Sequence, residues 1–147
     1  DLKSKKLIYE LKLENRVTLS KPLYGEEKFR IMSEASLFVL PSLNENFGVT
    51  VVESLMAETP VVSSHGAPWS KLVTEKCGWW VPGDEASLVS TIKKAMSLDE
   101  EERQLMGQRG REWVSTEFAW NSIGIAMSDV YEWLQGDITR PSFVDKS

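Results

Sequence analysis

Short, continuous apolar runs that alternate with helix-forming segments constrain the fold of this chain most strongly. The apolar run at 37–40 and the Val-Val-Ser segment at 61–63 each adjoin a proline, and a third run at 78–81 ends at Pro82. A strand that is apolar on both faces belongs in a parallel sheet whose two sides are covered. The alternation therefore predicts an α/β fold, a partial Rossmann-like parallel sheet with flanking helices.

The other segments divide into helices and one further strand. Apolar periodicity predicts a strand at 17–19 and helices at 2–13, 26–35, 48–57, 86–97, 99–117 and 121–135. Asn121 is expected to cap the last helix and Gly136 to end it. The chain opens in a helix and has few strands for a doubly wound sheet. We therefore expect a partial domain over 1–136 that lacks an upstream piece, and a flexible polar tail over 137–147.

Composition disfavours several classes of function. The net charge is −5, which argues against a nucleic-acid partner, and no apolar run has the length of a membrane span. The chain has one cysteine, Cys77, which cannot form a disulfide within the chain. With the single histidine, His65, it supplies too few ligands for a zinc site. A catalytic dyad of these two residues is a less favoured alternative. The low cysteine usage favours a reducing compartment such as the cytoplasm.

The chain has six tryptophans, a high number for its length. Three of them lie within or beside predicted helices and are expected to pack there: Trp113, Trp120 and Trp133. For the other three, packing and stacking on a sugar are both open: Trp69, Trp79 and Trp80.

The loop after the first buried strand, with the helix that it opens, holds the residues best suited to chemistry. The first amides of that helix, around Phe47, Gly48 and Val49, lack partners inside the helix and favour an anion such as a diphosphate. Glu45 lies just before the helix and Glu53 lies within it. Carboxylates repel phosphate but suit the hydroxyls of a ribose or hexose. One anion pocket flanked by two such carboxylates describes a nucleotide-diphosphate sugar.

The segment from Leu37 to Ser64 resembles the signature of the family 4 retaining glycosyltransferases, which have the two-domain GT-B fold. That signature has a buried strand, Pro-Ser, two glutamates separated by seven residues, and a Pro-Val-Val strand. Here these parts read Phe38-Val39-Leu40-Pro41-Ser42, Glu45 through Glu53, and Pro60-Val61-Val62-Ser63. The resemblance implies the C-terminal, donor-binding domain of such an enzyme, truncated at its N-terminal side.

The resemblance also implies roles for individual residues. Glu45 would be the catalytic residue at the transferred sugar, and Glu53 would bind the ribose hydroxyls. Backbone groups would hold the sugar and the diphosphate at Asn46, Phe47, Gly48 and Val49. A further loop would lie near the base, at Lys21, Pro22 and Leu23.

The implied reaction is transfer of a hexose, with retention of configuration, from a nucleotide-diphosphate sugar to a glycan or lipid-linked acceptor. It uses no metal and no other cofactor. The acceptor would be bound mainly by an N-terminal domain absent from this chain, so this chain alone is expected to be inactive. The whole enzyme would be cytoplasmic, with peripheral association at the inner face of the membrane compatible with the family.

The chain departs from the family pattern in places. Glu58 and Lys21 stand where the family usually has glycine, and its Gly-Gly pair after the second strand is reduced to Gly66-Ala67. The segments 66–69 and 77–80 resemble those of bacterial enzymes that build lipopolysaccharide or other surface glycans.

Two alternative functions are open. A nucleotide-sugar epimerase of the same fold would need acid–base residues, and His65 is the one histidine available. A non-catalytic α/β interaction module would need an acidic pocket at its strand ends. The strands here end in Pro41-Ser42 and Ser63-Ser64, which argues against that module.

Overall fold

The computed structural model describes residues 2–144, and its centre is a parallel sheet of three strands. These are β1 (Phe38–Leu40), β2 (Val61–Ser64) and β3 (Gly78–Val81), which lie side by side in that order. Val61 on the central strand is opposite Phe38 on one side and Gly78 on the other. The predicted partial parallel sheet with flanking helices is confirmed.

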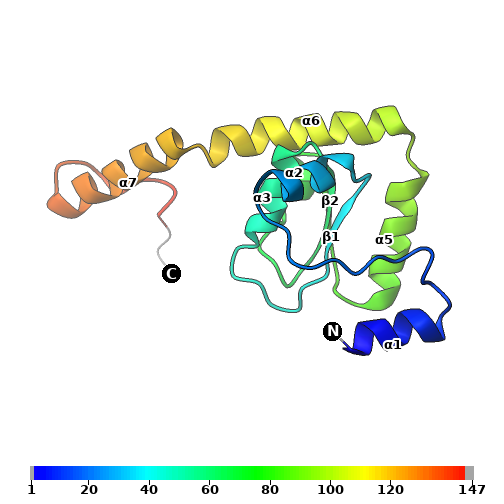
Figure 1. Cartoon of the computed structure of the whole chain (residues 1–147). Coiled ribbons are helices and arrows are strands. Elements are labelled where there is room, and N and C mark those ends of the chain that lie inside the picture. Colours follow the sequence, from blue (N-terminus) through cyan, green and yellow to red (C-terminus); the bar gives the residue numbers. More distant parts are fainter. Residues whose placement is uncertain (1, 145–147) are drawn as a thin grey trace.

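Helices precede, connect and follow these strands within the described residues (Figure 1). They are α1 (Leu2–Glu10), α2 (Gly25–Glu34), α3 (Val49–Met56), α4 (Lys71–Thr74), α5 (Glu85–Ser97), α6 (Glu100–Glu117) and α7 (Trp120–Gln135). Helix α3 contacts β1 and β2, whereas α5 contacts β2 and β3 from the other side of the sheet. Five of the predicted helices are confirmed to within one residue at each end, and the short α4 was not predicted.

The first helix is shorter than predicted. It ends at Glu10 because Lys12 adopts a left-handed conformation, with φ of 54°, and the Leu13 amide turns back to the Ile8 carbonyl at 2.9 Å. Such a turn satisfies the last carbonyls of a helix and stops its propagation.

The predicted strand at 17–19 is wrong, because these residues have no regular secondary structure. A strand is held by a ladder of hydrogen bonds to a neighbour, and β1 pairs on one side only, with β2, in the part of the chain that is described. Val17 and Leu19 instead lie against α1, where they line a cavity of about 370 Å³ with Ile8 and Tyr9.

The core lies between the sheet, α3 and α6. Its members are almost entirely inaccessible to solvent: Val51, Leu55, Val61, Ala67, Trp69, Leu72, Cys77 and Val114. Burial of such side chains is the main favourable contribution to folding. Because α3 is enclosed by the sheet and by α6, the loop that precedes it starts from a rigid base.

The tryptophans divide into packed and exposed side chains. Trp69 is only 3% exposed, and Trp113 packs against the same core. Trp80 also packs against the core and donates from Nε1 to the Ala67 carbonyl at 2.8 Å. The expectation that Trp120 packs is wrong, because it is 86% exposed at the start of α7, beyond the sheet and its covering helices.

Helix α7 projects away from the rest of the molecule (Figure 1) and has no buried residue. It begins at Trp120 with Ala119 as the N-cap, so the prediction that Asn121 caps it is wrong. Asn121 already lies inside the first turn, two residues after the capping position. Gly136 ends the helix, as predicted, with φ of 88°.

The segment after α7 is described as far as residue 144. The Asp137 amide donates to the Glu132 carbonyl at 3.0 Å, and Pro141 is buried. The remainder of the predicted tail, 145–147, lies outside the described residues. Across residues 2–144, none of the helices combines the length and the apolar character needed to cross a membrane.

Candidate functional site

Two loops meet at the carboxyl end of the sheet, the edge where open α/β sheets bind their ligands. One follows β1 and the other follows β2. The Glu45 amide in the first loop donates to the Gly66 carbonyl in the second at 2.7 Å, and the Ser64 hydroxyl donates to the Ser42 carbonyl. A Cβ on Gly66 would lie 2.2 Å from the Ser42 oxygen, so a larger residue would push the loops apart.

The turn into α3 depends on Gly48. This residue is buried and left-handed, with φ of 78° and ψ of 61°. A Cβ there would lie 3.2 Å from side-chain atoms of Glu45, Leu40 and Trp69. Glycine is therefore favoured both by the backbone angle and by the lack of space.

The amino end of α3 carries unpaired backbone donors. Among residues 2–144, no hydrogen-bond acceptor is found for the amides of Asn46, Phe47, Gly48 or Val49. These are the four positions expected to hold sugar and diphosphate. Free amides at the positive end of a helix dipole favour an anion, so the turn has the chemistry of a phosphate site.

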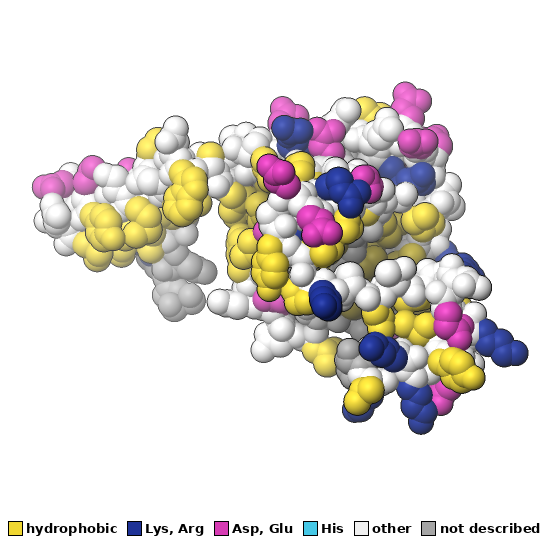
Figure 2. Space-filling model, viewed as in Figure 1, with side chains coloured by type: hydrophobic (Ala, Val, Ile, Leu, Met, Phe, Trp, Pro, Cys, Tyr) yellow, Lys and Arg dark blue, Asp and Glu magenta, His cyan; other side chains and the backbone are white. Residues whose placement is uncertain are grey.

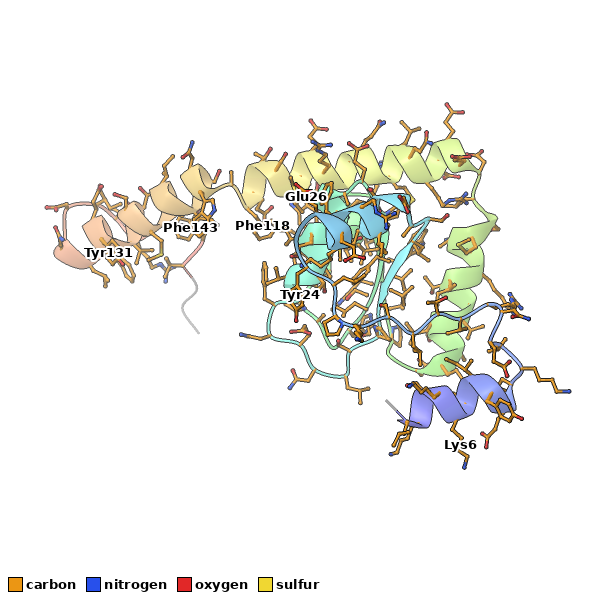
Figure 3. All side chains as sticks on the ribbon, in the orientation of Figure 1. Lys6, Tyr24, Glu26, Phe118, Tyr131 and Phe143 are labelled. Atoms are coloured by element: carbon orange, nitrogen blue, oxygen red, sulfur yellow. The ribbon has the colours of Figure 1, made fainter. Side chains whose placement is uncertain are left out.

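Aromatic side chains pack against this turn on the side of the core. Trp69 donates from Nε1 to the Phe47 carbonyl, and the two rings lie 5.1 Å apart between centroids. Phe47 also packs against Phe118 at 5.6 Å, and Figure 3 shows Phe118 at the junction of α6 and α7. Trp69 thus supports the loop from the core and offers no open face to a sugar.

The two motif glutamates have different surroundings. Glu45 is half-buried beside Gly48, and its carboxylate makes no hydrogen bond or ion pair within the described residues. Glu53 lies on α3, where its Oε1 atom accepts from Lys28 Nζ of α2. Both glutamates flank the first turns of α3, and one of them already has a basic partner.

The Lys28–Glu53 pair was not predicted. The two residues are 25 positions apart, so no local pattern in the sequence marks them as neighbours. They line a cavity of about 260 Å³ with Gly25, Val52 and other apolar residues.

The loop expected near the base lies directly before α2. Lys21 and Pro22 are exposed, and Leu23 is half-buried two residues before Gly25. Tyr24, labelled in Figure 3, projects from the start of α2 and is exposed. The structure brings this loop to the end of α2 that lines the Glu53 cavity, but Lys21, Pro22 and Leu23 do not line that cavity themselves.

Glu58, where the family usually has glycine, adopts a left-handed conformation with φ of 60°. This backbone angle costs a residue with a side chain more than it costs glycine. Glu58 pairs with Arg111 of α6 at 2.8 Å, so the departure adds a contact between the end of α3 and α6.

A catalytic dyad of Cys77 and His65 is wrong. Cys77 is fully buried in the core, where burial, assisted by the negative charge of Glu75, raises the pKa of its thiol to about 12. The thiol is therefore neutral and inaccessible, whereas a catalytic cysteine needs an accessible thiolate. His65 is exposed and packs against Trp80, with ring centroids 4.1 Å apart.

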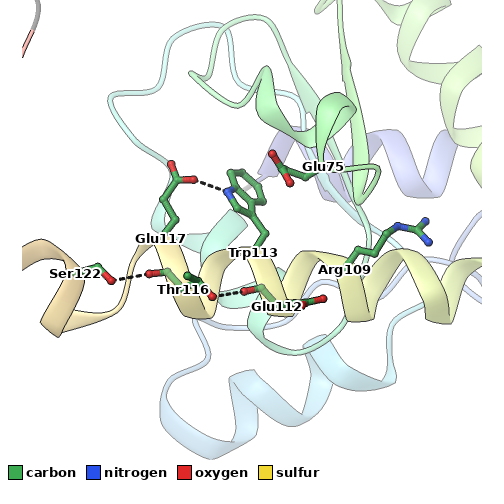
Figure 4. A pocket seen from close by; sticks show the side chains of 7 residues that line it. All are labelled: Glu75, Arg109, Glu112, Trp113, Thr116, Glu117 and Ser122. Atoms are coloured by element: carbon green, nitrogen blue, oxygen red, sulfur yellow. Dashed lines mark hydrogen bonds between the residues drawn. The ribbon is translucent and has the colours of Figure 1, made fainter. Parts of the chain in front are cut away.

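A larger cavity, of about 650 Å³, lies beside α6 at its junction with α7 (Figure 4). Its polar groups are largely engaged with one another: Trp113 Nε1 donates to Glu117 at 2.6 Å, and Ser122 donates to the Thr116 carbonyl at 2.8 Å. Burial alone would raise the pKa of Glu117, but hydrogen bonds from Lys71 and Trp113 lower it. This cavity has no array of free amides, so we place the functional site at α3.

Metal ligands are not grouped in the described part of the chain, where no three His, Cys, Asp or Glu side chains lie close enough to hold an ion.

Comparison with known families identifies the chain. The family model described as glycosyl transferases group 1 matches residues 1–113. The chain therefore belongs to this glycosyltransferase family, and the resemblance found in the sequence is confirmed.

Individual relatives support this assignment. The chain is 30% identical over 132 residues to an MMP α-(1→4)-mannosyltransferase of Mycolicibacterium hassiacum, covering 88% of this chain and 32% of that protein. It is 29% identical over 92 residues to the O-antigen chain mannosyltransferase RfbU of Salmonella typhimurium, covering 63% and 26%. The chain thus spans about a third or less of the curated relatives it matches.

Solved structures show the same fold. A sucrose-phosphate synthase from Thermosynechococcus elongatus superimposes with a TM-score of 0.78 at 29% identity, covering 92% of this chain and 34% of that protein. The parallel sheet and its helices are thus those of a GT-B glycosyltransferase.

Proposed function

We propose that this chain supplies most of the donor site of an enzyme that transfers a hexose, with retention, from a nucleotide-diphosphate sugar to a glycan or lipid-linked acceptor. One observation carries the proposal: the amino end of α3 has four free amides between two carboxylates, Glu45 and Glu53. Amides suit the diphosphate, and carboxylates suit the hydroxyls on either side of it.

Each group has a task in this mechanism. The amides of Asn46 to Val49 bind the diphosphate and stabilise the charge that develops as the nucleotide leaves, a form of electrostatic catalysis. Glu45 contacts the transferred sugar, and Glu53 accepts from the ribose hydroxyls. The loop at 21–23 lies near the base. The acceptor is bound mainly by parts of the enzyme outside this chain.

Two relatives that the chain resembles are named as mannosyltransferases, which supports a sugar-transfer reaction. One of them is named for the O-antigen chain, which supports a role in surface polysaccharide synthesis. On this proposal the enzyme acts in the cytoplasm, with peripheral association at the inner face of the membrane.

Ligand-observed NMR against UDP-, GDP- and ADP-sugars tests the donor site. We expect the chain to bind one nucleotide class, and Glu53→Ala to weaken that binding about 10-fold through loss of hydrogen bonds to a charged acceptor. Glu112→Ala, an exposed glutamate with no described ion pair, is the matched control. A Glu53→Ala variant that binds as well as wild type contradicts the ribose assignment.

An activity assay of the same chain tests the proposal that it supplies the donor site but not the acceptor site. We expect little or no transferase activity from this chain alone, because it lacks the acceptor site in the proposed arrangement. Robust turnover by the isolated chain would show that it binds both substrates.

A further inference from the structure

The ion pair between Lys28 and Glu53 differs from the other ion pairs described in residues 2–144. Its side chains are 30% and 31% exposed, whereas those of Lys71 and Glu117 are 57% and 39% exposed. It joins α2 to α3, and one of its members is a glutamate of the proposed donor site.

The two oxygens of Glu53 are used differently. Oε1 accepts from Lys28, and Oε2 has no donor within the described residues. A carboxylate offers acceptor sites on both oxygens, so the free one can still receive a hydroxyl. The lysine therefore occupies one side of the carboxylate and leaves the other side available.

The surroundings favour a fixed orientation. The pair lines a cavity of about 260 Å³ whose other lining residues are uncharged: Gly25, Phe29, Met32, Val52 and Met56. Charged hydrogen bonds are stronger beside apolar walls than in open water. A glutamate held in this way loses less rotational freedom when a ligand binds, because the freedom is already restricted.

We infer that Lys28 is a positioning residue: it holds Glu53 through Oε1 so that Oε2 accepts from a ribose hydroxyl of the donor, and it thereby sets the preference for ribonucleotides over deoxyribonucleotides. This inference rests on the proposed function. Lys28 acts through Glu53 and does not touch the reacting atoms.

Binding of paired nucleotides by the whole chain tests the inference. Dissociation constants are measured by calorimetry for UDP, GDP and ADP and for their 2′-deoxy and 3′-deoxy forms. We expect wild type to prefer the ribonucleotide of the bound class over at least one of its deoxy forms by about 10-fold, the value of a hydrogen bond to a charged group. Lys28→Met should weaken ribonucleotide binding about 5-fold to 10-fold and leave binding of that deoxy form unchanged.

Matched variants separate positioning from other effects. Lys28→Arg keeps the charge and should restore the preference, and Lys71→Met removes a lysine from a distant ion pair and should behave as wild type. Thermal unfolding identifies any variant that fails to fold, and Lys28→Gln then replaces Lys28→Met.

The outcomes distinguish this inference from the proposed function. If wild type prefers ribonucleotides and Glu53→Ala abolishes the preference while Lys28→Met retains it, the inference is overturned and the proposed function stands. Equal weakening of ribo and deoxy forms by Lys28→Met also overturns it, because Lys28 would then act on another part of the nucleotide. Wild type without nucleotide binding, or without a ribose preference, contradicts the ribose assignment and the inference together.

Discussion

Helices α3 and α7 are both rich in apolar residues, yet they have opposite surroundings. Helix α3 buries Val51, Ser54 and Leu55 between the sheet and α6. Helix α7 buries no residue, and Figure 2 shows apolar side chains along its surface. The exposed apolar residues there include Trp120, Ile123, Ile125, Met127, Tyr131 and Leu134.

The contrast shows what a helix needs in order to build a site. An apolar pattern predicts that a helix forms, but burial depends on the layers around it. Enclosure fixes the first turn of α3 against the loops after β1 and β2. Helix α7 has no such enclosure in the described chain, and we assign it no part in the donor site.

Removing a large side chain from each helix should expose this contrast. Leu55→Ala should lower the free energy of unfolding by about 3 kcal/mol, because Leu55 is fully buried and leaves a cavity. Leu134→Ala on α7, where the side chain is 68% exposed, should cost less than about 0.5 kcal/mol. Urea unfolding of the two variants measures the difference, and equal losses would show that α7 is packed in solution.

Two left-handed glycines, Gly48 at the start of α3 and Gly136 at the end of α7, sharpen the comparison. Gly48→Ala should cost about 2 kcal/mol, because it combines an unfavourable φ with crowding against Glu45, Leu40 and Trp69. Gly136→Ala should cost about 1 kcal/mol, because the same backbone penalty applies but no atom lies within 4 Å of the added Cβ. Thermal and urea unfolding check both values. Equal costs would mean that the turn at Gly48 can open without penalty.

A smaller effect, of opposite sign, is expected at the other end of α3. Glu58→Gly should raise the free energy of unfolding by about 0.5 kcal/mol. Glycine relieves the strain of the left-handed backbone. This gain exceeds two losses, the greater flexibility of glycine in the unfolded chain and the removal of an exposed ion pair with Arg111. Arg111→Ala is the control for the ion pair alone. A lower stability of Glu58→Gly would show that this pair, and not the backbone, dominates at this position.

Much of the fold was predictable because it depends on local signals. The strand at 38–40 is a continuous apolar run, the strand at 61–64 opens with Val61-Val62 after Pro60, and Gly136 ends α7 in the expected conformation. The strand predicted at 17–19 failed because strand formation depends on a neighbour that the local sequence does not reveal. The exposure of Trp120 was missed for a related reason, since its burial depends on what covers α7.

The candidate site was partly predictable. The spacing of Glu45, Gly48 and Glu53 identified the turn and its free amides, because these residues are close in the sequence. The contact of Lys28 with Glu53 and the support of Phe47 by Trp69 join residues 25 and 22 positions apart. Such pairs follow from the packing of α2 and of the second loop, which no single segment of the sequence specifies.

Amide chemical shifts of the ¹⁵N-labelled chain, recorded during titration with the nucleotide-diphosphate sugar of the class it binds, test the central claim most directly. The account predicts the largest shifts at the amides of Asn46, Phe47, Gly48 and Val49, with α7 unaffected. Shifts confined to α7 or to the cavity around Trp113, with none in the turn before α3, would contradict the assignment of the donor site.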